Sequence, residues 1–159
     1  MEFHFSEENL SKLSGVFSKY PNKKAAVMPV LYIAQEQNGY ISNEVISEVS
    51  KVCEITEEEV MGVVTFYTMY HQTKPGKYHI QVCTNVSCML RDGFEIYDAV
   101  KEKLGISNHG VTGDGLFSLE EVECMGSCGT APMIAVNEDF HENLTKELTL
   151  QILDNLKQV

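Results

Sequence analysis

The sequence lacks the features of several large functional classes. No apolar run reaches the roughly 18 residues that a membrane-spanning helix requires. Basic residues are few, since 12 Lys and Arg stand against 23 Asp and Glu and give a net charge of −11. Such a surface repels phosphate backbones and anionic lipid, so we expect neither nucleic-acid binding nor direct membrane insertion. A protein partner with a basic face fits this charge.

Signatures of substrate chemistry are also missing. The chain has no glycine-rich loop that would cradle phosphate, no Rossmann dinucleotide fingerprint and no Ser/His/Asp signature. We therefore expect no catalytic residues and no independent active site. The segment Met1–Glu8 is acidic and has neither the charged-then-apolar order of a secretory signal nor the arginines of a transit peptide. We expect a reducing cytosolic compartment, in which paired cysteines indicate metal or redox chemistry more often than disulfides.

The first half of the chain has the periodicity of helices. Apolar residues recur at helical spacing in four stretches, and Ser6, Ser42 and Thr56 precede three of them as N-cap residues. Thr56 and Glu59 match a capping box, and Asn38–Gly39 can end the second helix in a left-handed cap. We predict that residues 1–74 form a small helical bundle, and we assign partner docking to it.

The pattern changes at Lys74–Lys77. Alternation of apolar and polar residues begins at Tyr78, which is the period of a half-buried strand. We predict strands at 78–82, 116–123, 133–136 and around Phe140, with helices from about Cys88 to Leu104 and after Thr145. The fold class is therefore α+β, with a four-stranded sheet in residues 75–159.

Four of the five cysteines form two close pairs. Four residues separate Cys83 from Cys88, three separate Cys124 from Cys128, and 35 lie between the pairs. Each pair falls where a predicted strand ends, in the kind of loop that carries functional groups on a rigid scaffold. Four thiolates from two loops can hold a soft metal centre, and a [2Fe–2S] cluster needs four. These four residues are the candidate metal-binding and cofactor-binding site.

Cysteine spacing leaves one alternative open and disfavours others. Structural zinc accepts ligand pairs separated by two to four residues, so a zinc-stabilised interaction module remains an alternative. A dithiol oxidoreductase prefers Cys-x2-Cys, which neither pair has. A Rieske centre would need histidine ligands, and both pairs lack them. Disulfides are disfavoured by the reducing compartment, and four cysteines would allow three pairings.

The remaining notable side chains have structural interpretations. Cys53 lies among apolar residues at helical spacing, so we expect a buried small side chain. Phe66, Tyr67 and Tyr70 form an aromatic stripe that we assign to the core. The five histidines are scattered, and we expect exposed or capping positions for them.

Acidic residues gather beside the second cysteine pair. We assign Glu120, Glu121 and Glu123 to a solvated strand end. Negative charge there would oppose the arrival of an electron on a nearby cluster and lower its reduction potential.

Segments along nearly the whole chain resemble the 24-kDa-type subunit of respiratory NADH:quinone oxidoreductase (complex I), a family of thioredoxin-like [2Fe–2S] proteins. The similarity is carried by Cys83–Cys88 and Glu123–Pro132, and upstream by Asn38–Ser42 and Val64–Tyr67. Met125 stands where the family more often has leucine. Both residues are apolar, so the match holds.

The resemblance implies a thioredoxin-like fold for residues 75–159, in which Cys83, Cys88, Cys124 and Cys128 ligate one [2Fe–2S] cluster. It implies electron exchange with the FMN of an NADH-binding flavoprotein subunit, so that NADH and FMN act only through that partner. It further implies other peripheral-arm subunits as neighbours, on the cytoplasmic side of the membrane. The same subunit type occurs in NAD-linked hydrogenases and formate dehydrogenases, which is an alternative host. A free-standing ferredoxin homodimer is disfavoured by the helical first half.

Overall fold

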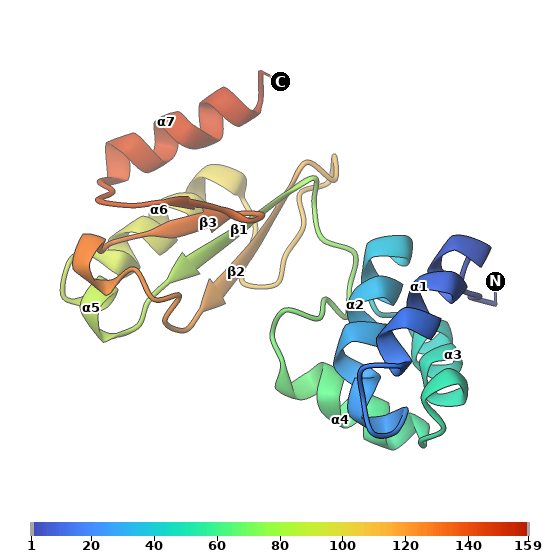
Figure 1. The fold of residues 1–159 in the computed structure, drawn as a ribbon. Helices are drawn as coiled ribbons and strands as arrows, with labels where there is room; N and C mark the ends of the chain where they lie inside the picture. The colour runs from blue at the N-terminus through green and yellow to red at the C-terminus, as the bar shows by residue number, and fades with distance from the viewer. Residues whose placement is uncertain (1, 159) are drawn as a thin grey trace. The chain divides into compact units, whose positions relative to one another are not determined.

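The computed structural model describes residues 2–158, and the chain divides into two compact units, Met1–Lys74 and Pro75–Val159 (Figure 1). Each unit has its own apolar core, and the two cores share no residues. Among the described residues, every helix is too short or too polar to cross a bilayer.

The first unit consists of helices. Its elements are α1 (Glu7–Phe17), the 3-10 turn η1 (Lys24–Ala26), α2 (Val27–Asn38), α3 (Asn43–Cys53) and α4 (Glu57–Phe66). Ser6, Ser42 and Thr56 cap α1, α3 and α4 by accepting hydrogen bonds from backbone amides, and Glu59 completes the capping box on Thr56. Gly39 ends α2 at φ 85°. These caps confirm the predicted helix ends. The ends could be predicted because a side-chain cap acts within one turn of the helix.

The core of the first unit is mostly aliphatic, with Phe5, Cys53 and Tyr70 also among its buried side chains. Cys53 is fully buried at the end of α3, as expected. Tyr70 is buried as well, and its hydroxyl donates to the backbone oxygen of Met28 at 2.9 Å. The core assignment of Phe66 and Tyr67 was wrong, because Phe66 is 76% exposed and Tyr67 is 37% exposed. Helix α4 ends at Phe66 and Tyr67 is extended, so the aromatic spacing no longer follows one helical face.

The second unit is a four-stranded mixed sheet with helices packed on it. Its strands are β1 (Tyr78–Cys83), β2 (Phe117–Val122), β3 (Ile134–Val136) and β4 (Asp139–His141), in the order β2-β1-β3-β4. Strands β1 and β2 are parallel, whereas β3 is antiparallel to both β1 and β4. The helices are α5 (Val86–Met89), α6 (Gly93–Leu104) and α7 (Lys146–Leu156), with a 3-10 turn η2 (Cys128–Thr130). Buried residues of α6 and α7 share one core with the sheet.

The single helix predicted from about Cys88 to Leu104 is in fact two helices. Helix α5 is short, and Asp92 adopts a left-handed conformation at φ 65° before α6 begins at Gly93. A Cβ on Gly93 would lie 2.8 Å from the carbonyl carbon of Cys88, so only glycine fits this close approach. Apolar spacing continues across the break and therefore does not reveal it.

Candidate metal centre

Parallel pairing of β1 with β2 brings both cysteine pairs to one edge of the sheet. Cys83 ends β1 and is the Cα partner of Val122, which ends β2. The carboxyl ends of parallel strands lie side by side. Cys88 follows Cys83 in α5, Cys124 lies two residues beyond β2, and Cys128 begins η2. All four predicted residues thus lie at or after the carboxyl ends of β1 and β2.

The first pair is buried. Cys83 and Cys88 are each 3% exposed and pack against Ala131 and Met133. Burial, together with the interaction with Cys83, raises the pKa of Cys88 to about 11, and Cys128 adds a smaller effect in the same direction. Cys128, from the second pair, is therefore close enough to Cys88 to affect its pKa. A cation that binds here would compensate the cost of burying thiolates.

The second pair is exposed and closely spaced. The sulfur atoms of Cys124 and Cys128 lie 3.3 Å apart, and both residues are exposed. The Gly126 amide donates to the Cys124 sulfur at 3.4 Å, from a backbone at φ 91° that glycine adopts readily. This amide, followed by Cys128, lowers the pKa of Cys124. The loop therefore stabilises a thiolate at position 124.

Polar side chains tie the two cysteine segments to each other. The Thr84 hydroxyl donates to the Glu121 carboxylate at 2.7 Å, and the Thr84 amide donates to the Val122 oxygen at 3.3 Å. The Asn85 side-chain amide donates to the Glu123 carboxylate. These bonds link the residues just after β1 to the end of β2, so the cysteine-bearing loops are held at a fixed separation.

The sulfur atoms are arranged as two pairs rather than as one tetrahedral set. Within residues 2–158, no three of the four lie within 4.8 Å of one another. Three thiolates on a single zinc ion would lie about 3.8 Å apart, given a Zn–S distance of about 2.3 Å. A centre with two metal ions, each bound by two thiolates, matches the pairs better. The donor set fits a [2Fe–2S] cluster.

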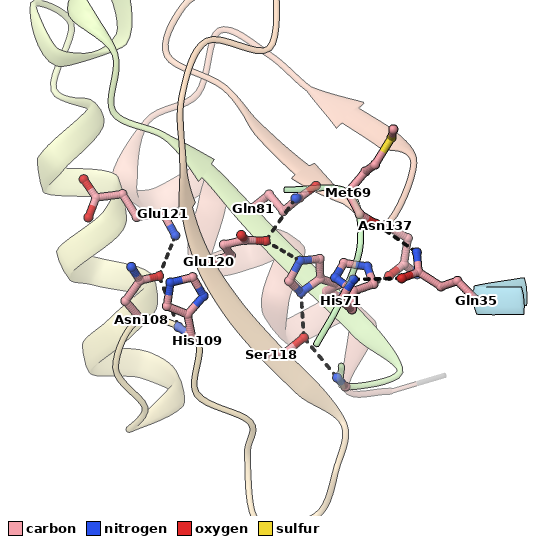
Figure 2. A network of polar contacts seen from close by, with 12 residues as sticks. Gln35, Met69, His71, Gln81, Asn108, His109, Ser118, Glu120, Glu121 and Asn137 are labelled. Atoms are coloured by element: carbon pink, nitrogen blue, oxygen red, sulfur yellow. Dashed lines mark hydrogen bonds and ion pairs between the residues drawn. The ribbon is translucent and has the colours of Figure 1, made fainter. Parts of the chain in front are cut away.

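A buried polar network on β1 and β2 was not expected from the sequence (Figure 2). The Nδ1 atom of His79 lies 2.8 Å from the Ser118 hydroxyl, and its Nε2 atom lies 2.9 Å from the Glu120 carboxylate. Gln81 donates to the same carboxylate at 3.2 Å. The predictions that His79 is exposed or capping and that Glu120 is solvated were wrong, because their side chains are only 12% and 11% exposed.

Strand register explains this network. His79 is the Cα partner of Ser118, and Gln81 is the partner of Glu120, so all four side chains lie on one face of the two strands. The intervening residues point to the other face, into the apolar core. Alternation in the sequence indicated one polar face, and only the register shows that its side chains meet.

Comparison with known proteins shows similarity over most of the chain. A family model described as "Thioredoxin-like [2Fe-2S] ferredoxin" matches residues 13–157. The chain is 42% identical over 158 residues to "NADH dehydrogenase [ubiquinone] flavoprotein 2, mitochondrial" of Dictyostelium discoideum, covering 98% of this chain and 64% of that protein. It is 42% identical over 158 residues to a subunit of the NADH-quinone oxidoreductase of Rickettsia bellii, covering 98% of this chain and 95% of that protein.

The chain is also similar to a protein of Thermus thermophilus and to a solved structure. A subunit of the NADH-quinone oxidoreductase of that organism is 42% identical over 151 residues, covering 94% of this chain and 83% of that protein. The crystal structure of an NAD+-reducing [NiFe]-hydrogenase in the H2-reduced state matches with a TM-score of 0.70 and 16% identity, over 81% of this chain and 22% of that chain. At this identity, the likeness extends to the fold alone.

Proposed function

Because the chain belongs to the thioredoxin-like [2Fe-2S] ferredoxin family, we propose that Cys83, Cys88, Cys124 and Cys128 ligate its [2Fe–2S] cluster. The observation that carries this proposal is the convergence of two cysteine pairs on the edge formed by β1 and β2. Each close pair supplies the two thiolates of one iron. Cys53 is buried in the core of the other unit and takes no part.

A bound [2Fe–2S] cluster accepts and returns one electron at a time. The two cysteine pairs would give a bound cluster different surroundings on its two sides. Buried Cys83 and Cys88 exclude water from one side, while the Gly126 amide donates to the Cys124 sulfur and favours added negative charge. Cys124 and Cys128 are exposed, so a partner's redox group could approach a bound cluster from that side.

The host that we propose is NADH-quinone oxidoreductase. Relatives that are subunits of this enzyme are 42% identical, and the chain covers 95% and 83% of their length in Rickettsia bellii and Thermus thermophilus. In this host the chain exchanges electrons with the FMN of the NADH-binding flavoprotein subunit and binds neither NADH nor FMN itself. It belongs to the peripheral arm on the cytoplasmic side of the membrane, and residues 1–74 serve in docking to partner subunits.

A metal analysis tests the cluster directly. Full-length protein, purified without oxygen, is assayed for iron, sulfide and zinc, and its EPR spectrum is recorded after reduction with dithionite. About two irons and two sulfides per chain, with a rhombic signal on reduction, are expected. Stoichiometric zinc with no EPR signal, even after expression with added iron, would replace this proposal with the zinc-stabilised module.

The host requires a separate experiment. A tagged chain is recovered from its native cells with its associated subunits, and the complex is assayed for FMN and for electron transfer from NADH to quinone. Both are expected. Recovery with hydrogenase or formate dehydrogenase activity and no quinone reduction would instead assign the chain to the diaphorase part of one of those enzymes.

A further inference from the structure

One asparagine side chain connects the two cysteine segments. Asn85 lies two residues after Cys83 and three before Cys88. Its Oδ1 atom accepts from the Val86 amide at 2.8 Å at the start of α5, and its Nδ2 atom donates to the carboxylate of Glu123. A carboxamide is suited to this place because it accepts at one end and donates at the other.

Glu123 is the residue immediately before Cys124. Its carboxylate is exposed and would move freely if it were not bonded to Asn85. The bond therefore does two things: it joins the two cysteine segments through side chains, and it holds one negative charge close to the second cysteine pair. The Thr84–Glu121 bond also joins the segments, but Glu121 is three residues from Cys124.

We propose that Asn85 and Glu123 are positioning residues for the cluster, which slow its loss and lower its reduction potential. This inference rests on the proposed ligation by the four cysteines. The hydrogen bond fixes the separation of the two loops, and the fixed carboxylate opposes the electron that reduction adds. Neither residue is a ligand.

Three variants separate the bond from the charge. Glu123→Gln removes the charge, but its side-chain oxygen can still accept from Asn85. Asn85→Asp keeps the acceptor for the Val86 amide and places a second carboxylate against Glu123, so the bond becomes a repulsion. In the double variant N85D/E123Q, the introduced amide can donate to the introduced carboxylate. The bond returns with its polarity reversed, and the net charge equals that of the wild type.

The experiment uses the full-length protein with its cluster. Cluster loss to an added iron chelator is followed by visible absorbance, and the midpoint potential is measured by an EPR-monitored redox titration. The matched control is Glu102→Gln, which removes an exposed carboxylate from α6. Its cluster lifetime and potential are expected to equal those of the wild type.

The expected results differ for each variant. Glu123→Gln keeps the wild-type rate of loss but raises the ratio of reduced to oxidised cluster about threefold at a fixed potential, which is about 28 mV at 59 mV per tenfold for one electron. Asn85→Asp loses its cluster at least about threefold faster. The double variant returns to a rate close to that of the wild type.

Four outcomes would overturn the inference. Two concern the single variants: the potential of Glu123→Gln shifts no more than that of Glu102→Gln, or Asn85→Asp loses its cluster at the wild-type rate. Two concern the double variant: it loses its cluster as fast as Asn85→Asp, or neither it nor Asn85→Asp assembles a cluster. A wild-type protein without iron refutes the proposed function as well, whereas a wild-type cluster with unaltered variants refutes only the positioning role.

Discussion

Cys53 and the paired cysteines have the same side chain in very different surroundings. Cys53 is enclosed by apolar residues of the helical unit, and burial raises its pKa to about 11. Cys124 is exposed, lies 3.3 Å from another sulfur, and receives a hydrogen bond from Gly126. Reactivity toward metals and electrophiles follows the thiolate, so we expect the two thiols to differ in reactivity.

Replacing Cys124 with alanine should abolish or strongly destabilise the cluster, because one iron loses a thiolate. Replacing Cys53 with alanine should leave the visible and EPR spectra unchanged and weaken only the packing of the helical unit. Iron content and EPR of the two purified variants check this. Cluster loss in the Cys53 variant would show that the assignment of that residue is wrong.

The lowered pKa of Glu120 predicts that the free energy of unfolding depends on pH. Burial acts to raise its pKa, but hydrogen bonds from His79 and Gln81 outweigh this and bring the pKa below its ordinary value of 4.5. A carboxyl group with a lowered pKa stabilises the fold above its unfolded pKa, and this contribution is lost as the pH falls through the folded pKa. We expect Glu120→Gln to cost about 1–3 kcal/mol at pH 7 and progressively less below about pH 4.5.

Urea unfolding of wild type and Glu120→Gln, followed by circular dichroism from pH 7 to pH 3, measures this difference. The gap between the two free energies of unfolding should narrow toward acid. A constant gap would mean that Glu120 stabilises the sheet through packing alone rather than through its charge.

The junction between α5 and α6 depends on a close approach of two backbone segments. A methyl group on Gly93 would lie 2.8 Å from the carbonyl carbon and oxygen of Cys88 and 3.1 Å from the Cys83 oxygen. Gly93→Ala should therefore lower the free energy of unfolding by about 1–3 kcal/mol and speed cluster loss. The first cysteine pair would be displaced.

The control for this variant is Gly62→Ala in α4. Apart from its chain neighbours and the adjacent backbone of α4, nothing lies within 4 Å of the position of its Cβ, so alanine should be neutral or stabilise the helix by up to about 1 kcal/mol. Chemical denaturation and cluster absorbance of both variants provide the comparison. Equal behaviour of the two would show that the Gly93 junction tolerates a side chain.

Local signals in the sequence predict most of the elements but not how distant elements meet. Thr56 and Gly39 mark helix ends through bonds within one turn, so these ends were predictable. The cysteine pairs indicated a metal site by residue type and spacing alone. The meeting of His79 with Glu120 depends on the register between β1 and β2, which no short segment encodes. The bend at Asp92 is hidden because apolar spacing continues through it.

Each of the two units of the chain has its own hydrophobic core. Side chains from α1 to α4 form one, and those from the sheet, α6 and α7 form the other. The four candidate ligands all belong to the second unit. A core of its own is the usual condition for independent folding.

We therefore predict that a fragment of residues 75–159 folds and retains the EPR signal of the whole protein. The same fragment should fail to assemble with the partner subunits, if residues 1–74 dock to them. Iron content, EPR and co-purification of the fragment check both statements. A fragment that binds no iron would show that the helical unit supports the cluster site.

The parallel alignment of β1 with β2 also bears on how a cluster site is assembled. Backbone hydrogen bonds and the apolar core place Cys83 beside the end of β2, and these interactions join protein atoms only. In zinc fingers, by contrast, the metal itself drives folding. We therefore expect β1 and β2 to pair before iron and sulfide bind, whether these come as inorganic ions or as a cluster from a donor protein.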